Sequence, residues 1–480
     1  MTTSGQPGAR RALLWSFGNT AVGKFGTLFI SIVIARILGP DELGTYAVAL
    51  VALAAVLSFN ELGVSLAIVR WEEDPSRIAP TVTTISVVTS LAVFVAAWIA
   101  TPAFAAAMGD PGATGVVRLM LVCVPLNGVA ATPAALLQRD YQQGRRAAAD
   151  QVNIWLGAVL SVSLASVGLG AMSLAVGRAV AAIVFTGMLI RLSPSRLSLG
   201  WNREVVRPLL RFGIPLAGSS LVVFAVAYAD QLVVGNRLGT QALGFYLLAF
   251  NLASWPVTVF SQPIRAVAPA AFARIQHDAR LMDRNFRSAF RLVLVLALPA
   301  CAFLAGAAEP VVTLVYREIW APAAPALQWL ACQAAVRIAF ELSYDFLAVK
   351  RRSVALMTIQ VCWLAALVPA LVVGSRHGIV GVAAAQCAVA ILVLLVCYGW
   401  ALHGAGIRLG AMIRTSLVPV AGGTLVWAGS RAAAQGHPQA LVAVTTAGVV
   451  TLAITGALAW ASRTHLHLLR STDVLEEVPA

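Results

Sequence analysis

The sequence has few charged residues for its length. Only 11% of its 480 residues are Asp, Glu, Lys or Arg, whereas a typical soluble domain has about 25%. Hydrophobic residues make up 59% of the chain. A soluble chain of this length could not bury so much apolar surface. The composition therefore excludes a soluble globular protein and indicates a polytopic membrane protein.

Motifs for ATP use, metal binding and redox chemistry are also missing. No GxxxxGK[S/T] motif is present, which excludes an ATP-driven pump encoded by this chain alone. The six histidines form no HxxxH pair, and none lies near a cysteine at metal-ligand spacing. The six cysteines all fall within apolar runs without a CxxC motif, so we expect free thiols packed in helices. We expect no cofactor, no metal and no enzymatic activity.

Signals of nucleic-acid binding are missing, although the formal net charge is +14. Aromatic residues do not alternate with the basic ones, as stacking on bases would require. Basic residues collected in the loops on one side of a membrane explain the charge, so we expect no nucleic-acid partner. No long outside loop with clustered acidic residues is predicted, which disfavours a polysaccharide polymerase or ligase.

What the sequence does contain is a series of long apolar runs. They are continuously apolar rather than alternating, which favours helices over a β-barrel. The first run carries Lys24, is too long for a signal-peptide core, and is expected to be retained as a helix. About fourteen membrane-spanning segments are predicted, at 13–38, 43–69, 80–108, 114–136, 149–169, 171–192, 212–238, 243–265, 287–308, 325–349, 354–373, 378–402, 411–431 and 439–461.

The basic residues predict the orientation of these segments. With the N-terminus in the cytoplasm, most loop arginines fall on the cytoplasmic side and both termini are cytoplasmic. The longest linker, RLSPSRLSLGWNREVVRPLLR, runs from Arg191 to Arg211 and is basic. It is a positively charged hinge, and over Asn202–Arg211 it could also form a short amphipathic helix on the membrane surface, since the two interpretations are compatible. A few arginines are predicted in the outside loops instead of the cytoplasmic ones, mainly Arg237, Arg317, Arg376 and Arg431.

A short motif occurs twice. Leu38–Tyr46 reads LGPDELGTY and Leu238–Tyr246 reads LGTQALGFY, so Leu, Gly, Leu, Gly and Tyr recur with one spacing. Six predicted helices separate the copies, so both copies face the same way. They mark the first helix pair of two lobes related by an axis along the membrane normal. The glycines allow a sharp turn and a close helix approach, and Tyr46 and Tyr246 suit the interface belt.

Outside the motif the two copies diverge. The first has Lys24 where the second has Phe224, and the second has Asp230 where the first has Ile30. If the lobes divide the work, the first meets the substrate charge and the second couples transport to an ion.

The predicted fold is an all-α polytopic membrane protein with these parts: 1–192, N-terminal six-helix lobe; 193–211, basic cytoplasmic linker; 212–403, C-terminal six-helix lobe; 404–462, two extra transmembrane helices; 463–480, cytoplasmic tail.

The chain resembles a known transporter family along nearly its whole length. ALLWSFGNTAVGKFGTLFISIVIARILGPDELGTYAVAL is similar to the family's opening helix pair. LLRFGIPLAGSSLVVFAVAYADQLVVGNRLGTQALGFYLLAFNLASWP is similar to the start of its second lobe, including Asp230. EPVVTLVYREIWAPAAPALQWLA and HGIVGVAAAQ resemble its later turns. The family is that of polysaccharide transporters (Wzx-type flippases), in the superfamily that also holds multidrug and toxin extrusion transporters and the lipid II flippase.

The resemblance implies a flippase that moves lipid-linked oligosaccharide repeat units from the cytoplasmic to the outer leaflet by alternating access. Nothing in the composition or the periodicity of the sequence indicates that substrate. The nearest alternative is a cation-coupled multidrug exporter of the same superfamily, whose cavity should be acidic or aromatic. Buried basic residues disfavour that alternative.

Basic residues inside the predicted helices are the candidates for a substrate site. A charge at mid-bilayer costs roughly 2.5–3.5 kcal/mol, so such residues should face a water-filled space or form a pair. Lys24 lies near the middle of the first helix with no acidic residue nearby, which favours a cavity that meets phosphate or acidic sugar over a structural pair. Arg36, near the outer end of that helix, and Arg178, about two turns into the sixth, either join this cavity or reach the headgroups.

A charged stripe is predicted on the tenth helix. Arg337, Glu341 and Asp345 are spaced i, i+4, i+8, so they stack on one face. The stripe is either a neutralised structural ladder or the lining of a cavity in which Arg337 reaches substrate, and we favour the lining. A purely structural stripe would tolerate exchange of the Arg337 and Glu341 charges.

Acidic residues in the membrane are the candidates for coupling. Asp230, in the seventh helix, is a candidate H⁺ or Na⁺ site, or a salt-bridge partner that sets helix packing. Glu61, near the inner end of the second helix, could serve either role.

We therefore predict a bacterial inner-membrane flippase for polyprenyl-(pyro)phosphate-linked oligosaccharides in cell-surface polysaccharide biosynthesis. Its expected partners are this lipid-linked glycan and the bilayer, with a polysaccharide polymerase and glycosyltransferases as neighbours in the pathway. We expect a monomer.

Overall fold

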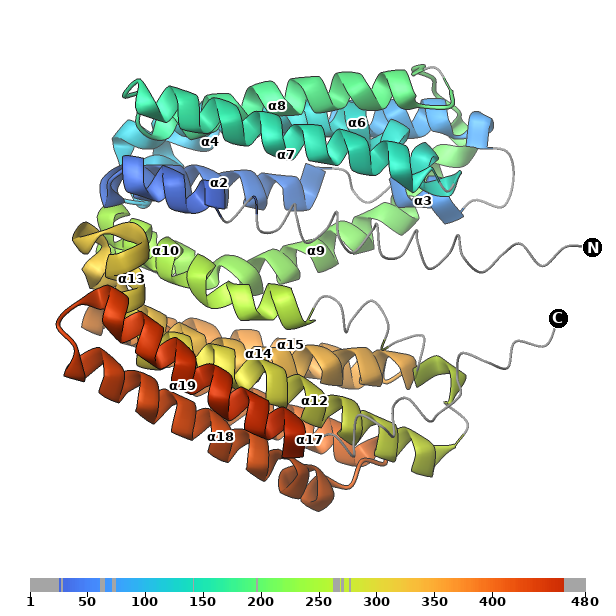
Figure 1. Cartoon of the computed structure of the whole chain (residues 1–480). Coiled ribbons are helices and arrows are strands. Elements are labelled where there is room, and N and C mark those ends of the chain that lie inside the picture. Colours follow the sequence, from blue (N-terminus) through green and yellow to red (C-terminus); the bar gives the residue numbers. More distant parts are fainter. Residues whose placement is uncertain are drawn as a thin grey trace, which may run out of the picture. The chain divides into compact units, whose positions relative to one another are not determined.

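The structure is a computed structural model that describes residues 26, 29–60, 65–70, 75–140, 142–195, 197–261, 268, 272–275 and 278–461. In these ranges the regular elements are helices and no strand occurs (Figure 1). Among the described residues, eleven helices are long and apolar enough to cross a membrane. These findings confirm the prediction of an all-α polytopic membrane protein.

The number of crossings stays a prediction. Most of the first expected segment, 13–38, lies outside the described residues. One candidate span, Ser353–Gly404, covers two of the expected segments, which are separated by a tight turn at Ser375–His377. The helix Ala324–Val349 is not among the eleven, because its glutamine and charged side chains lower its hydropathy.

The chain divides into two compact units. The first extends to Tyr228 and includes Gly235–Gly244; the second contains Ala229–Val234 and the chain from Phe245 onward. The helix α9, Arg203–Leu238, therefore contributes to both units. Residues 203–211, predicted to belong to a hinge that could also form an amphipathic helix, are the first turns of α9. The predicted domain limits remain predictions.

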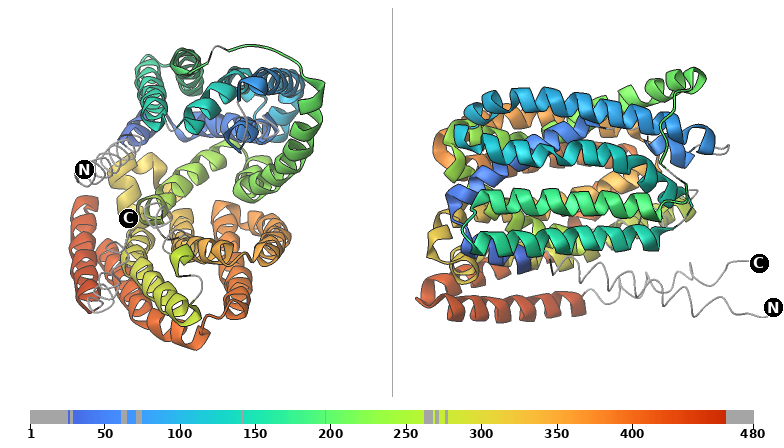
Figure 2. Two further views of the ribbon diagram at one scale, coloured as in Figure 1. Left: turned by 90° about the vertical axis from the view of Figure 1, so that its right-hand side faces the viewer. Right: turned by 90° about the horizontal axis from the view of Figure 1, so that it is seen from above.

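In the first unit, long helices run side by side, as the views in Figure 1 and Figure 2 agree. α6 contacts both α4 and α8, and α7 packs along α8. Proline occurs inside α4 and α6, which membrane helices tolerate because neighbouring helices satisfy the freed backbone groups. The helices of this unit are α2 (Pro40–Asn60), α3 (Ser65–Arg70), α4 (Ala79–Ala107), α5 (Thr114–Leu121), α6 (Cys123–Arg139), α7 (Gln143–Ser166) and α8 (Ala171–Leu192).

The second unit has an aromatic core. The rings of Phe286 and Phe346 lie 4.6 Å apart between centroids, and Phe272 packs edge-on against Phe346 at 5.5 Å. A short π-helical segment, Val257–Ser261, follows α10, and another, Ala390–Leu394, joins α16 to α17. The helices wholly or largely in this unit are α10 (Thr240–Pro256), α12 (Ala279–Gly306), α13 (Ala308–Tyr316), α14 (Ala324–Val349), α15 (Ser353–Gly374), α16 (Gly378–Val389), α17 (Leu395–Gly404), α18 (Leu409–Gly436) and α19 (Ala440–Ala461).

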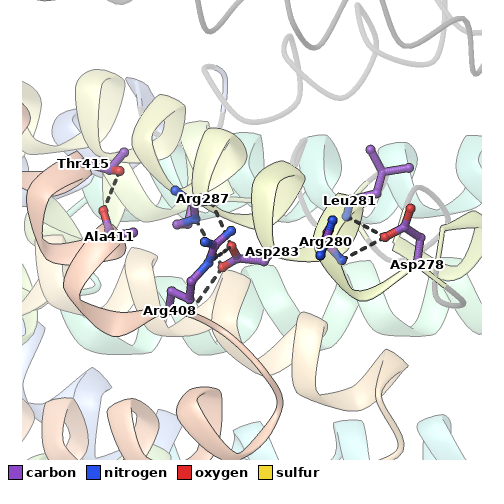
Figure 3. A network of polar contacts seen from close by, with 8 residues as sticks. All are labelled: Asp278, Arg280, Leu281, Asp283, Arg287, Arg408, Ala411 and Thr415. Carbon is purple, nitrogen blue, oxygen red and sulfur yellow. Dashed lines mark hydrogen bonds and ion pairs between the residues drawn. The ribbon is translucent and has the colours of Figure 1, made fainter.

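A carboxylate fixes the start of α18 against α12. The two oxygens of Asp283 accept hydrogen bonds from the Arg287 guanidinium, at 2.8 Å from Nη2, and from the Arg408 backbone N–H, at 3.2 Å. The Arg408 side chain also donates, with Nε at 3.1 Å (Figure 3). One turn earlier, Asp278 caps α12 by accepting from the backbone N–H groups of Arg280 and Leu281. The last two helices thus have a defined attachment within the second unit.

The two copies of the repeated motif contact each other within the first unit. Gly44 lies against the carbonyl oxygen of Thr240, and Gly244 lies against the carbonyl oxygen of Pro40, so that a Cβ at either glycine would overlap a backbone oxygen. Gln241 Nε2 donates to Asp41 Oδ2 at 3.3 Å. Equivalent positions of the repeat therefore meet reciprocally, and the glycines allow the close helix approach that the motif predicts.

All six cysteines are free, as predicted. Cys123, Cys301 and Cys387 are buried, which agrees with thiols packed in helices. Cys332 is exposed on the protein surface, so the expectation of packing was wrong for this residue.

Candidate functional site

A cavity of about 420 Å³ lies inside the first unit, and the side chains that line it come from α2, α6, α7 and α8. Ile30 and Ile34, which precede α2, close one side with leucines of α2. A polar minority faces this apolar lining, as is usual for a site that orients a ligand. These polar residues are Tyr46, Asn127, Asn153, Ser161, Arg178 and Thr186.

Arg178 places a cation in this cavity. Its helix, α8, packs tightly on α7, because Gly177 lies against Ser161 and leaves no room for a Cβ. Buried Ala175 and Ala179 belong to the packed part of the same helix. The Arg178 side chain approaches the hydroxyl of Tyr46 on α2. A guanidinium offers several N–H donors in a planar fork, which matches phosphate and carboxylate oxygens.

The structure describes one of the other two basic candidates of the first lobe, Arg36. Arg36 is exposed and does not line the cavity. Its position along the helix is on the side away from Ile30 and Ile34, which do line it. Lys24 and Glu61 lie outside the described residues.

The charged stripe of α14 forms as its spacing predicts. Arg337 Nε lies 3.3 Å from Glu341 Oε1, which makes an i, i+4 ion pair. The Arg337 side chain is 42% exposed and that of Glu341 is 18% exposed. Asp345, one turn further, is buried. An ion pair this accessible leaves much of the guanidinium open to an anionic ligand while the carboxylate offsets part of its charge.

Asp230 is buried among neutral hydrogen-bond donors in the second unit. The Tyr246 hydroxyl donates to Asp230 Oδ2 at 2.8 Å, and Gln386 Nε2 approaches the same oxygen at 3.3 Å. The Gln231 backbone N–H donates to Oδ1 at 2.8 Å. Among the residues that the structure describes, no ion pair of Asp230 occurs. A carboxyl held in this way is chemically suited to exchange a proton or a small cation.

Sequence reasoning missed two members of this cluster. Tyr246 was predicted to lie in the interface belt, but its side chain is fully buried and the prediction was wrong. The reason is that its hydroxyl satisfies a buried carboxylate 16 positions earlier in the chain. Gln386 comes from α16, and its Oε1 lies 3.0 Å from the hydroxyl oxygen of Tyr246. No periodic signal connects Gln386 with Asp230, since 156 positions separate them.

Two bacterial polysaccharide proteins are similar in sequence to this chain. The chain is 27% identical over 310 residues to the succinoglycan biosynthesis transport protein ExoT of Rhizobium meliloti; the match covers 64% of this chain and 63% of that protein, which is just under two thirds of its length. It is 24% identical over 353 residues to the lipopolysaccharide biosynthesis protein WzxC of Escherichia coli, covering 73% and 72%.

The fold is similar to that of a solved transporter. The lipid II flippase MurJ, in an inward closed conformation, matches with a TM-score of 0.78 at 12% identity, covering 94% of this chain and 99% of that one. At this identity the likeness shows the fold alone. The family model described as polysaccharide biosynthesis protein matches residues 33–325, which is more than half of the chain. The chain belongs to this family of polysaccharide biosynthesis proteins.

Proposed function

We propose that the protein is a flippase that moves polyprenyl-(pyro)phosphate-linked oligosaccharides from the cytoplasmic to the outer leaflet for cell-surface polysaccharide biosynthesis. The observation that carries the proposal is the cavity in which Arg178 is held among apolar helices. A cation there offsets the charge of a phosphate that must leave water. The name of ExoT, a succinoglycan biosynthesis transport protein, supports a polysaccharide-related substrate.

In the proposed cycle, Arg178 and Tyr46 meet the phosphate or an acidic sugar, while the polyprenyl tail stays in the bilayer. Asn127 and Asn153 supply neutral hydrogen-bonding groups along the same cavity. Arg337, with its accessible guanidinium, and Lys24 are proposed as further cationic contacts, whereas Arg36 is proposed to reach the lipid headgroups. The chain itself forms or breaks no covalent bond in this cycle, and it is proposed not to be an enzyme.

Uptake of H⁺ or Na⁺ at Asp230 is proposed to bias the protein between its inward-open and outward-open states. A ligand shifts such an equilibrium only by binding one state better than the other. Loss of a Tyr246 or Gln386 hydrogen bond in one state would supply that difference. Glu341, Asp345 and Glu61 are proposed as secondary members of the charge network.

We further propose that the protein is a monomer located in the bacterial inner membrane, with both termini cytoplasmic. A polymerase and glycosyltransferases are proposed as its neighbours in the pathway.

Deletion of the gene tests the proposed function. Polyprenyl-linked oligosaccharide should accumulate on the cytoplasmic face, as measured by extraction and mass spectrometry with a membrane-impermeant glycan label. A plasmid copy should restore surface polysaccharide, whereas a copy with Arg178→Gln should restore less than about a tenth of it, because a charge-assisted contact is worth about 1.5–3 kcal/mol. Arg237→Gln, which removes an exposed arginine that does not line the cavity, is the matched control.

Two outcomes would overturn the proposal. Unchanged lipid-linked oligosaccharides together with increased drug sensitivity would favour a multidrug exporter instead. Full complementation by Arg178→Gln, at equal protein in the membrane, would remove the cavity of the first unit from the transport path.

A further inference from the structure

A second basic site lies in the first unit, apart from the cavity that holds Arg178. It is a surface groove of about 740 Å³ at the beginning of α9, and Arg203, Arg207 and Arg211 line it. They occupy positions i, i+4 and i+8 of the helix, so their side chains share one face. The remaining lining residues are Trp201, Val206 and Leu210.

The opposite face of this helical segment is anchored. Leu209 is buried in an apolar cluster with Ile68 of α3 and Ile78 and Val82 at the start of α4. Val205 packs partly against the same cluster. Since this side of the helix faces the protein, the arginine stripe is directed away from it.

The segment just before the helix is also fixed. Gly200 exchanges hydrogen bonds with Thr84, donating from N at 3.0 Å and accepting at O from the threonine hydroxyl at 2.8 Å. The Asn202 backbone N–H donates to Thr81 Oγ1 at 3.1 Å, and the Asn202 side chain caps α9 by accepting from the Glu204 N–H. Trp201, between these two anchored residues, is 60% exposed. An exposed tryptophan on a fixed backbone is a typical contact for the membrane interface.

The charge of the groove is not neutralised locally. All three arginines are exposed, and in the part of the chain that the structure describes no ion pair joins any of them to a carboxylate. Glu204 is the acidic residue of the first turn of α9, and its carboxylate does not line the groove. Guanidinium groups prefer phosphate oxygens, which they can bind with two parallel hydrogen bonds.

The spacing of the charges favours several small anions over one compact one. At 1.5 Å of rise per residue, Arg203 and Arg211 are about 12 Å apart along the helix axis. Val206 and Leu210 are partly buried against the same apolar cluster, and the surface that they leave open between the charges would contact acyl chains below a headgroup. We propose that this groove binds the headgroup phosphates of anionic phospholipids, and that the protein therefore requires anionic lipid for full stability in the bilayer. The inference does not depend on the proposed flippase activity.

The test uses the full chain purified into nanodiscs that contain phosphatidylglycerol, phosphatidylcholine or both. The variant R203Q/R207Q/R211Q should retain about a hundredfold less phosphatidylglycerol through detergent extraction, since each of the three basic residues near an anionic surface contributes about a fivefold factor. The matched control is R280Q/R284Q/R414Q, which removes three exposed arginines of the second unit and should retain lipid like the wild type. Trp201→Ala should weaken retention without changing charge.

Two further measurements distinguish a phospholipid from a diphosphate as the ligand of the groove, and distinguish loss of charge from a folding defect. R203K/R207K/R211K keeps the charge and should keep most of the bound phosphatidylglycerol. Equal retention by the glutamine triple and the control would overturn the proposal. The proposal would also be overturned if undecaprenyl diphosphate or inorganic pyrophosphate protected the groove arginines from an arginine-directed label while phosphatidylglycerol did not. The ligand of the groove would then be a diphosphate.

Discussion

At the residue scale, the shortest side-chain hydrogen bond to the buried Asp230 carboxylate comes from the Tyr246 hydroxyl. Both side chains are buried, so water cannot replace the hydroxyl if it is removed. A buried acceptor that loses a donor costs more than the hydrogen bond itself was worth, because its desolvation is no longer compensated.

Tyr246→Phe is expected to destabilise the protein by about 1–3 kcal/mol, the cost of an unsatisfied buried polar group. The measurement is the thermal unfolding midpoint in detergent, with and without Na⁺ and at several pH values. Tyr344→Phe is the control, because Tyr344 is a partly exposed tyrosine in the same unit. An unchanged midpoint for Tyr246→Phe would show that the hydroxyl does not hold Asp230.

The ion pair of Arg337 and Glu341 allows the two interpretations of the α14 stripe to be separated. Because the pair is partly exposed, it contributes little to stability, about 0–1 kcal/mol. The double exchange R337E/E341R should therefore leave the unfolding midpoint nearly unchanged. We expect it to abolish transport, because the guanidinium would move one turn along the helix. Transport at the wild-type rate would instead make the stripe a structural ladder.

At the scale of elements, the reciprocal contact of the two repeated motifs determines how closely α2 and α10 approach at their first turns. Gly44 and Gly244 each face a backbone oxygen, which cannot move as the end of a flexible side chain could. Small residues allow two membrane helices to approach this closely. Such packing contacts are needed because the hydrophobic effect does not drive helices together among lipid tails.

Gly44→Ala and Gly244→Ala should each lower stability by about 1–3 kcal/mol, the usual cost of overpacking. The cost at these sites exceeds the gain of up to about 1 kcal/mol that alanine brings to a helix. Gly218→Ala measures that gain alone, because Gly218 is helical and a Cβ added there would meet no other atom within 4 Å. Thermal unfolding compares the three variants. Equal midpoints for Gly44→Ala and Gly218→Ala would mean that the helices can separate without cost.

At the scale of the whole molecule, the chain combines a net charge of +14 with two compact units that carry different polar sites. The described cavity of the first unit contains a basic residue, and the described buried cluster of the second contains an acidic one. This difference matches the predicted division of work, in which one lobe meets substrate charge and the other couples transport to an ion. The division itself remains a prediction.

Transport in proteoliposomes is expected to depend on an imposed H⁺ or Na⁺ gradient. Asp230→Asn removes the charge that a cation would neutralise while keeping hydrogen-bonding oxygen and nitrogen atoms in place. The variant should flip labelled lipid-linked oligosaccharide at a rate that no longer responds to the gradient. Glu318→Gln, a change in the short helix after α13, is the control. A gradient response equal to that of the wild type would exclude Asp230 as the coupling site.

The sequence by itself determined the features that depend on local pattern. Composition and long apolar runs determined a helical membrane protein, because a bilayer requires backbone hydrogen bonds within each segment. The spacing of Arg337 and Glu341 determined their pairing, because residues four apart share a helix face. The repeated glycines indicated a close helix approach before any partner was known.

Only the tertiary structure decided which distant residues meet. It brought Gln386 to Asp230, Tyr46 to Arg178, and Gly44 to Thr240, and it buried Tyr246, which the sequence had assigned to the membrane interface. These contacts join helices far apart in the chain, so helical periodicity contains no information about them. They depend on how side-chain volumes fit when whole helices pack, and that fit is a property of the assembled fold.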